Sequence, residues 1–122
     1  MSNTTAQKFL VNCSNGKNDL ERATVSFILA VTASKTAETA MFVTSDAADI
    51  VVKGGADGLV ADGYESLPGL IDAFVENGGK IWLCPACAKA KGITENDVRQ
   101  GVEIAGAPRS MAFLASGAQV LA

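Results

Sequence analysis

The sequence of 122 residues contains no histidine. Histidine is the side chain that most often serves as a general base near neutral pH, so its absence excludes Ser-His and Cys-His catalytic pairs. It also excludes haem ligation by imidazole and every zinc site that needs a histidine ligand. Any chemistry in this chain must therefore use other groups.

Clusters of positive charge are also missing. Lys and Arg number 10 against 13 Asp and Glu, and no stretch combines basic residues with interleaved aromatic residues. Such stretches are what bind nucleic-acid phosphates and anionic lipid surfaces. We therefore expect no nucleic acid and no membrane among the partners of this protein.

Long hydrophobic runs are absent as well. The longest apolar-leaning stretch, Ala23 to Ala33, is too short to cross a bilayer, and Met1 to Lys8 lack the basic region and apolar core of a secretory signal. These features favour a cytoplasmic location. In that reducing compartment, three cysteines are more typical of free thiols than of a structural disulfide framework.

The sequence does have enough apolar material for one well-packed core. Hydrophobic residues make up 48% of the chain and charged residues 19%, a balance that favours a buried sheet and an apolar subunit interface over disorder. A chain of this length is the size of one ordinary domain. We therefore predict a single domain over residues 1–122.

Short apolar runs alternate with helical patterns along the chain. The predicted strands are Phe9–Cys13, Thr39–Thr44, Lys80–Leu83, Val102–Ile104 and Ala118–Leu121. The predicted helices run from an Asn18/Glu21 capping box toward Ala33, from Ser45 through Val52, from Ser66 to Asn77, over a turn or two opened by Thr94 and Asp97, and from Pro108 through Ala115. Continuous apolar strands separated by helices indicate a parallel sheet covered on both faces, so we predict a three-layer α/β/α fold.

Residues 55–65 have the composition of a loop with a short strand at Leu59-Val60. Loops of that length often carry function. We expect this loop to lie over the functional site.

The motif Cys84-Pro85-Ala86-Cys87 directly follows the apolar run Lys80–Leu83 and opens a short segment that Gly92 closes. This arrangement predicts a buried strand that delivers two thiols to the first turn of a helix. A helix N-terminus carries about half a positive charge and unpaired N–H donors, which stabilise a thiolate. We therefore predict that Cys84 is reactive, with an inert buried cysteine as the alternative.

The two other cysteines are open to more than one interpretation. Cys87 is one helical turn from Cys84, where it either resolves a sulfenic acid or persulfide as a disulfide or packs on the sheet. Cys13 also ends a predicted strand. If that strand neighboured the one ending before Cys84, the strand ends would lie about 5 Å apart and the thiols could join an acidic residue in a zinc site; an intervening strand makes the gap roughly 10 Å.

Several polar and aromatic residues close to these thiols in the predicted fold are expected to be structural. Lys89 and Lys91 complement the carboxyl end of the predicted helix, and Trp82 belongs in the core or at an oligomer contact. The turn Asn15-Gly16-Lys17-Asn18 is only a weak anion-binding signal, because the dinucleotide and P-loop spacings are both absent. Three further residues are expected at the surface, with an approach to the thiol as the alternative: Tyr64, Glu65 and Arg109.

The segment from Lys80 to Ile93 resembles the signature of the DsrE/DsrF-like family of small sulfur-handling proteins, in which a strand ends in cysteine and a short helix closes in a basic residue, glycine and an aliphatic residue. The first strand, the turn at Gly16 and the Gly-Gly before the third strand are also similar to that family. The resemblance implies a five-stranded parallel sheet, homotrimers or hexamers, and a persulfide-carrying cysteine that falls on Cys84. Cys87 matches a second cysteine present in only some relatives.

The resemblance also implies that a strand intervenes between those that end at Cys13 and before Cys84. Cys13 is not part of the family's motif. We therefore expect no metal site and no cofactor.

Three functions are consistent with these patterns. The leading hypothesis is a sulfur carrier in which Cys84 accepts sulfane sulfur and passes it on by thiol exchange with donor and acceptor proteins. The second is a peroxiredoxin-like thiol oxidoreductase that uses Cys84 and Cys87, although no peroxidatic motif is recognisable. The third is a non-catalytic oligomeric binding module with incidental cysteines. The missing histidine suits the first, since a helix terminus then replaces a base.

Overall fold

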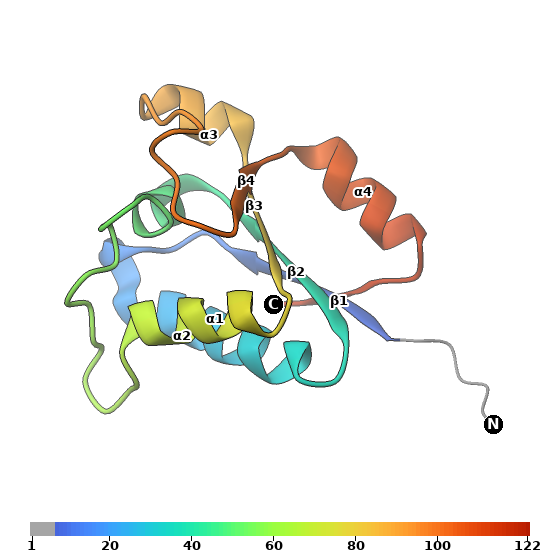
Figure 1. Cartoon of the computed structure of the whole chain (residues 1–122), viewed down its shortest axis with the longest axis horizontal. Coiled ribbons are helices and arrows are strands. Elements are labelled where there is room, and N and C mark those ends of the chain that lie inside the picture. The colour runs from blue at the N-terminus through green and yellow to red at the C-terminus, as the bar shows by residue number, and fades with distance from the viewer. Residues whose placement is uncertain (1–6) are drawn as a thin grey trace.

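The computed structural model of the chain describes residues 7–122 (Figure 1). Residues 1–6, which carry most of the segment inspected for a secretory signal, lie outside the described residues. The strands are β1 (Lys8–Cys13), β2 (Glu38–Val43), β3 (Lys80–Leu83), β4 (Val102–Ile104) and β5 (Gln119–Leu121). The helices are α1 (Leu20–Ser34), α2 (Leu67–Glu76), α3 (Pro85–Ala90) and α4 (Ala107–Ala115), with 3-10 segments η1 (Lys17–Asp19) and η2 (Ser45–Ile50).

The five strands form one parallel sheet in the order β4-β3-β2-β1-β5. Each predicted strand is present, and the predicted parallel α/β fold is confirmed. Parallel pairing requires a crossover after every strand, which the helices supply. Because all strands run the same way, their carboxyl ends gather at one edge of the sheet.

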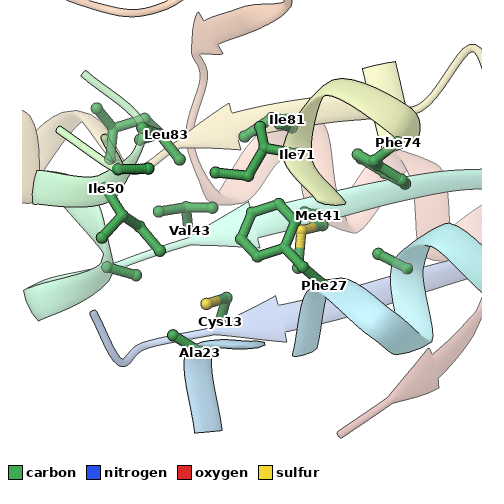
Figure 2. Close-up of a cluster of buried hydrophobic side chains, with 14 of the residues drawn as sticks. Cys13, Ala23, Phe27, Met41, Val43, Ile50, Ile71, Phe74, Ile81 and Leu83 are labelled. Carbon is green, nitrogen blue, oxygen red and sulfur yellow. The ribbon is translucent and has the colours of Figure 1, made fainter. Parts of the chain in front are cut away.

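The main core lies on the face of the sheet that α1 and α2 cover. Phe27 of α1 meets Phe74 of α2 edge to face, with ring centroids 6.5 Å apart, above the buried Met41 of β2 (Figure 2). All three side chains are fully buried. Because successive side chains of a strand point to opposite faces of the sheet, every second strand residue points into this cluster.

The opposite face carries a smaller cluster under α4. Leu10, Ala40, Trp82 and Ala105 are buried there, and Phe113 and Leu114 of α4 pack against them. Trp82 is 5% exposed and meets Phe113 edge to face at 5.5 Å. The prediction that Trp82 belongs in the core is confirmed, and helices on both faces confirm the three layers (Figure 1).

The predicted N-cap of the first helix is wrong by one residue. Asp19 caps α1, since its side chain accepts a hydrogen bond from the N–H of Arg22 at 3.1 Å. Asn18 instead accepts from the N–H of Gly16 at 2.9 Å and closes the preceding turn. The 3-10 segment η1 separates β1 from α1, so the capping position lies later in the chain than the sequence pattern indicated.

The helical turns predicted after Gly92 are not formed. The carboxylate of Asp97 accepts hydrogen bonds from the N–H and the hydroxyl of Thr94, at 2.7 and 3.0 Å. The two residues that were predicted to start a helix therefore form a local turn with each other. Val98 then forms an isolated bridge with Val52. The chain therefore leaves the turn as an extended segment. The predicted Ser45–Val52 helix is also shorter than expected and is the 3-10 segment η2.

The loop over residues 55–65 makes its contacts away from the thiols. Leu59 packs against the main core, and the Tyr64 hydroxyl donates to Glu21 of α1 at 2.8 Å. Val60 makes only an isolated bridge with Ser66. The contacts therefore differ from the expectation that this loop covers the site. Within the described part of the chain, no helix combines the length and the apolar character needed to cross a bilayer.

Candidate functional site

Cys84 lies at the junction between β3 and α3, as the motif predicts. Its N–H donates to the carbonyl of Val43 on β2, and its carbonyl accepts from the N–H of Ala88 in α3, both at 2.9 Å. Pro85 occupies the first helical position, where its fixed φ suits a helix and its missing N–H leaves no donor unpaired. The backbone of Cys84 is therefore held from the strand side and from the helix side.

The Cys84 thiol is half-buried, and its environment favours the thiolate. Burial raises the pKa of this thiol, but the backbone N–H of Cys87, the Cys87 side chain and the backbone N–H of Ala86 outweigh it, so the pKa lies below its usual 9.0. No N–H of α3 makes a full capping hydrogen bond to the sulfur. The stabilisation therefore comes mainly from nearby dipoles and not from one short hydrogen bond.

Cys87 lies on the first turn of α3 and contacts the end of β2. Its sulfur accepts a hydrogen bond from the backbone N–H of Ser45 at 3.2 Å. Ser45 has a φ of 54°, the left-handed region that residues other than glycine seldom adopt. Sequence inspection missed Ser45, because Ser45-Asp46 there indicated only a helix cap.

Cys13 is separated from the other two cysteines. Its strand β1 and the thiol-bearing β3 have β2 between them, which confirms the intervening-strand arrangement. The side chain is 1% exposed and points into the main core (Figure 2). Burial raises the pKa of the Cys13 thiol above 9.0, despite its hydrogen bond to the carbonyl of Asn15. Among residues 7–122, no group of three or more Cys, Asp or Glu is placed to hold a metal ion.

Two basic residues near the thiols, Lys91 and Arg109, pair with carboxylates. Lys89 is in the last turn of α3, and the Lys91 ammonium lies 3.5 Å from the carboxylate of Asp49. Arg109 forms a two-pronged pair with Glu103, at 3.0 and 3.1 Å, and stacks over the Trp82 ring. An approach to the thiol was the alternative prediction for three residues. Arg109 is instead paired with Glu103, Tyr64 is hydrogen-bonded to Glu21, and Glu65 is exposed.

The turn after β1 packs against the 3-10 segment η2, which begins at Ser45. A Cβ on Gly16 would collide with the backbone carbonyl of Asp46, so this glycine lets the turn pack directly on η2. The turn therefore helps to hold the segment that presents Ser45 to Cys87.

The surface around the thiols is open. Two cavities, of about 480 and 460 Å³, lie elsewhere, one beside α2 and the other between the end of β1 and α1, and neither is lined by Cys84 or Cys87. On the other side, α4 begins against Pro85, where a Cβ on Gly106 would come within 3.2 Å of the proline ring. Ser45, Pro85 and Ala86 beside the thiols are exposed, and Cys84 and Cys87 are partly exposed, so a second macromolecule can approach them.

Alkylation should distinguish Cys84 from Cys13 by pH. Because the pKa of Cys84 is lowered, its reaction with iodoacetamide should reach half-maximal rate below pH 9, the midpoint of an ordinary thiol, whereas Cys13 should stay unmodified in the folded protein. Peptide mass spectrometry after timed quenching gives the rate at each site. Unfolded protein in urea is the control, where all three cysteines should react alike; a Cys84 midpoint at or above pH 9 would contradict the lowered pKa.

The fold and the position of Cys84 define a class: small three-layer α/β proteins with a thiol at the carboxyl edge of a five-stranded parallel sheet. Within that class, residues 7–122 match the model of the DsrE/DsrF-like family. The chain belongs to this family.

One known protein is similar over most of the chain. An uncharacterized protein of Methanocaldococcus jannaschii, MJ0760, is 31% identical over 107 residues, which are 87% of this chain and 38% of that protein. The present chain thus spans well under half the length of that relative.

Two solved structures share the fold. The ychN protein of E. coli superposes with a TM-score of 0.70 at 18% identity, covering 96% of this chain and all of that one. MTH1491 of Methanobacterium thermoautotrophicum, a protein of unknown function, gives 0.67 at 12% identity, covering 94% and 97%. At these identities the likeness concerns the fold alone.

Proposed function

We propose that this protein is a cytoplasmic sulfur carrier in which Cys84 accepts sulfane sulfur as a persulfide and passes it to another thiol. The observation that carries the proposal is the Cys84 thiol itself, half-buried beside an open surface, with a pKa lowered by nearby dipoles in a chain without histidine. Membership of the DsrE/DsrF-like family is consistent with a sulfur-relay role.

Loading of Cys84 requires no metal, cofactor or oxidant. The Cys84 thiolate attacks the outer sulfur of a donor persulfide R–S–SH; the new S–S bond forms as the donor S–S bond breaks, and R–S⁻ leaves. One sulfur atom moves and the oxidation states balance. A lowered thiol pKa increases the fraction of attacking thiolate near neutral pH. The open surface gives a donor or acceptor protein access to this sulfur.

Cys87 is proposed to release the sulfur. Its thiolate attacks Sγ of the Cys84 persulfide, a Cys84–Cys87 disulfide forms, and the outer sulfur departs as HS⁻. The disulfide then needs two electrons from a cellular dithiol reductant. The support for this role is that the Cys87 side chain is close enough to act on the Cys84 thiol.

A second candidate function uses the same pair. A thiol oxidoreductase would oxidise Cys84 with peroxide to a sulfenic acid, which Cys87 would resolve as a disulfide with loss of water. The proximity of the two thiols favours this reaction equally. Catalytic consumption of peroxide with a dithiol reductant distinguishes it from a carrier, which transfers sulfur in stoichiometric amounts.

Assembly into a homotrimer or hexamer is also proposed. Met111 on α4 and Val120 on β5 are large apolar side chains that are 63% and 52% exposed. An apolar contact with another copy would remove them from water. Light scattering in solution measures the mass, and a monomer at all concentrations contradicts the proposal.

The carrier role is tested by intact-protein mass spectrometry after incubation with inorganic polysulfide. We expect a gain of one sulfur atom per chain that cyanide or dithiothreitol removes, because both attack sulfane sulfur. Sulfinic acid, with two oxygen atoms of almost the same mass, resists both reagents and serves as the control. A wild-type protein and a Cys87→Ser variant that both gain no removable sulfur would eliminate the carrier role, because the variant lacks the thiol that releases HS⁻.

A further inference from the structure

We propose that the backbone N–H of Ser45 is a positioning group for Cys87, and that the left-handed backbone at Ser45 is retained because it directs this N–H at the Cys87 sulfur. The inference deepens the proposed function and rests on it only for the release step. It adds the carboxyl end of β2 to a site that the sequence motif places entirely after β3.

The contact joins segments 42 residues apart in the chain. The N–H of Ser45, directly after Thr44 at the end of β2, donates to the Cys87 sulfur in α3 at 3.2 Å. Cys84 is bound to the same strand end, through its N–H and the carbonyl of Val43. Both cysteines of the motif are thus registered against the end of β2.

The backbone conformation of Ser45 needs a reason. Among the described non-glycine residues, only Ser45 and the final residue Ala122 have a positive φ. A left-handed serine persists where its surroundings enforce it, and such conformations concentrate at functional sites. Here the conformation delivers one specific hydrogen bond, to a sulfur.

The surrounding structure does hold Ser45 in place. Ala47, Ala48 and Ile50, which follow it in η2, are fully buried, and the N–H of Ala47 returns to the carbonyl of Thr44 at 3.0 Å. On the other side, Gly16 packs against the backbone carbonyl of Asp46 without room for a Cβ. The peptide before Ser45 therefore has little freedom to turn away from Cys87.

The Ser45 N–H donates to the Cys87 sulfur, and the Cys87 side chain in turn acts on the Cys84 thiol. Before loading, the Cys87 side chain stabilises the Cys84 thiolate. Once Cys84 carries sulfur, HS⁻ leaves as Cys87 attacks Cys84 Sγ, and the attacking form of Cys87 is the thiolate, which carries a negative charge. The Ser45 N–H is already in place to stabilise that charge, and a hydrogen bond to a charged sulfur is stronger than one to a thiol.

The first test separates this contact from sulfur chemistry. In the Cys84→Ser background, a Ser45→Val change should slow Cys87 alkylation at neutral pH roughly tenfold, since a β-branched residue disfavours positive φ and turns the N–H away. Ser45→Gly keeps both the N–H and the positive φ and should restore the alkylation rate. Ser116→Val, in an ordinary conformation at the end of α4, is the matched control.

The second test concerns release. Protein preloaded with polysulfide should lose HS⁻ roughly tenfold more slowly with Ser45→Val than with Ser45→Gly, while the amount of sulfur loaded on Cys84 stays the same. Equal alkylation rates and equal release rates in folded Ser45→Val and Ser45→Gly overturn the inference. If neither wild type nor Cys87→Ser loads sulfur, the carrier role fails, and the alkylation rates alone still decide whether Ser45 positions Cys87.

Discussion

Replacing Cys84 with serine should abolish persulfide formation on this protein. Serine keeps the size and the helix-capping position, but its hydroxyl has no accessible anionic form near neutral pH and no capacity to bond sulfane sulfur. We expect the polysulfide-dependent gain of sulfur to fall from one atom per chain to background, a loss of roughly a hundredfold or more, because the nucleophile is removed completely. Intact-mass and peptide-level mass spectrometry measure it.

Cys87→Ser and Cys13→Ser are the matched controls for that result. Cys87→Ser should still load sulfur on Cys84 but retain it longer, because the proposed resolving thiol is gone. Cys13→Ser should load and release as wild type does, since that thiol is buried in the core. Equal loading of Cys84→Ser and wild-type protein would mean that sulfur attaches elsewhere, and the assignment of Cys84 would be lost.

The largest effect on stability is expected for Phe27→Ala. Phe27 is fully buried at the centre of the main core and meets Phe74 edge to face. Removing its ring loses apolar burial and leaves a cavity, which together lower the free energy of unfolding by about 3–5 kcal/mol. Urea denaturation followed by circular dichroism measures the change, provided that the transition is two-state.

Val25→Ala on the same helix is the control for Phe27→Ala. Val25 is 38% exposed on the outer side of α1, so its truncation removes little packing and should change the free energy of unfolding by less than about 1 kcal/mol. A Phe27→Ala effect no larger than the Val25→Ala effect would show that the core does not depend on the contact between α1 and α2.

Local patterns predicted the strands well because a strand that is buried on both faces is a continuous run of apolar residues. Lys80–Leu83 has the predicted bounds, and its residues Ile81, Trp82 and Leu83 are all buried. A parallel strand covered by helices on both sides must be apolar on successive residues, and few other elements of that length share this pattern. The parallel α/β fold followed from these strands and the helices between them.

Helix starts were predicted less well, because their signals are shared with turns. Asn18 and Thr94 both have a suitable partner three residues later, yet both belong to turns in the structure. Ser, Thr, Asn and Asp side chains bond nearby N–H groups in turns and 3-10 segments as readily as at helix ends. Only the packing of the following residues decides between these outcomes.

The sequence by itself determined the thiol pair and the placement of Cys84 between a strand and a helix, since these depend on residues adjacent in the chain. Tertiary structure decided which residues from distant segments approach that pair. The strand order places Cys13 on β1, two strands from the β3 strand that precedes Cys84. The left-handed backbone at Ser45, after β2, directs the Ser45 N–H to Cys87. The reason is physical: strand order and backbone conformation at Ser45 depend on packing summed over many distant residues, which no local pattern records.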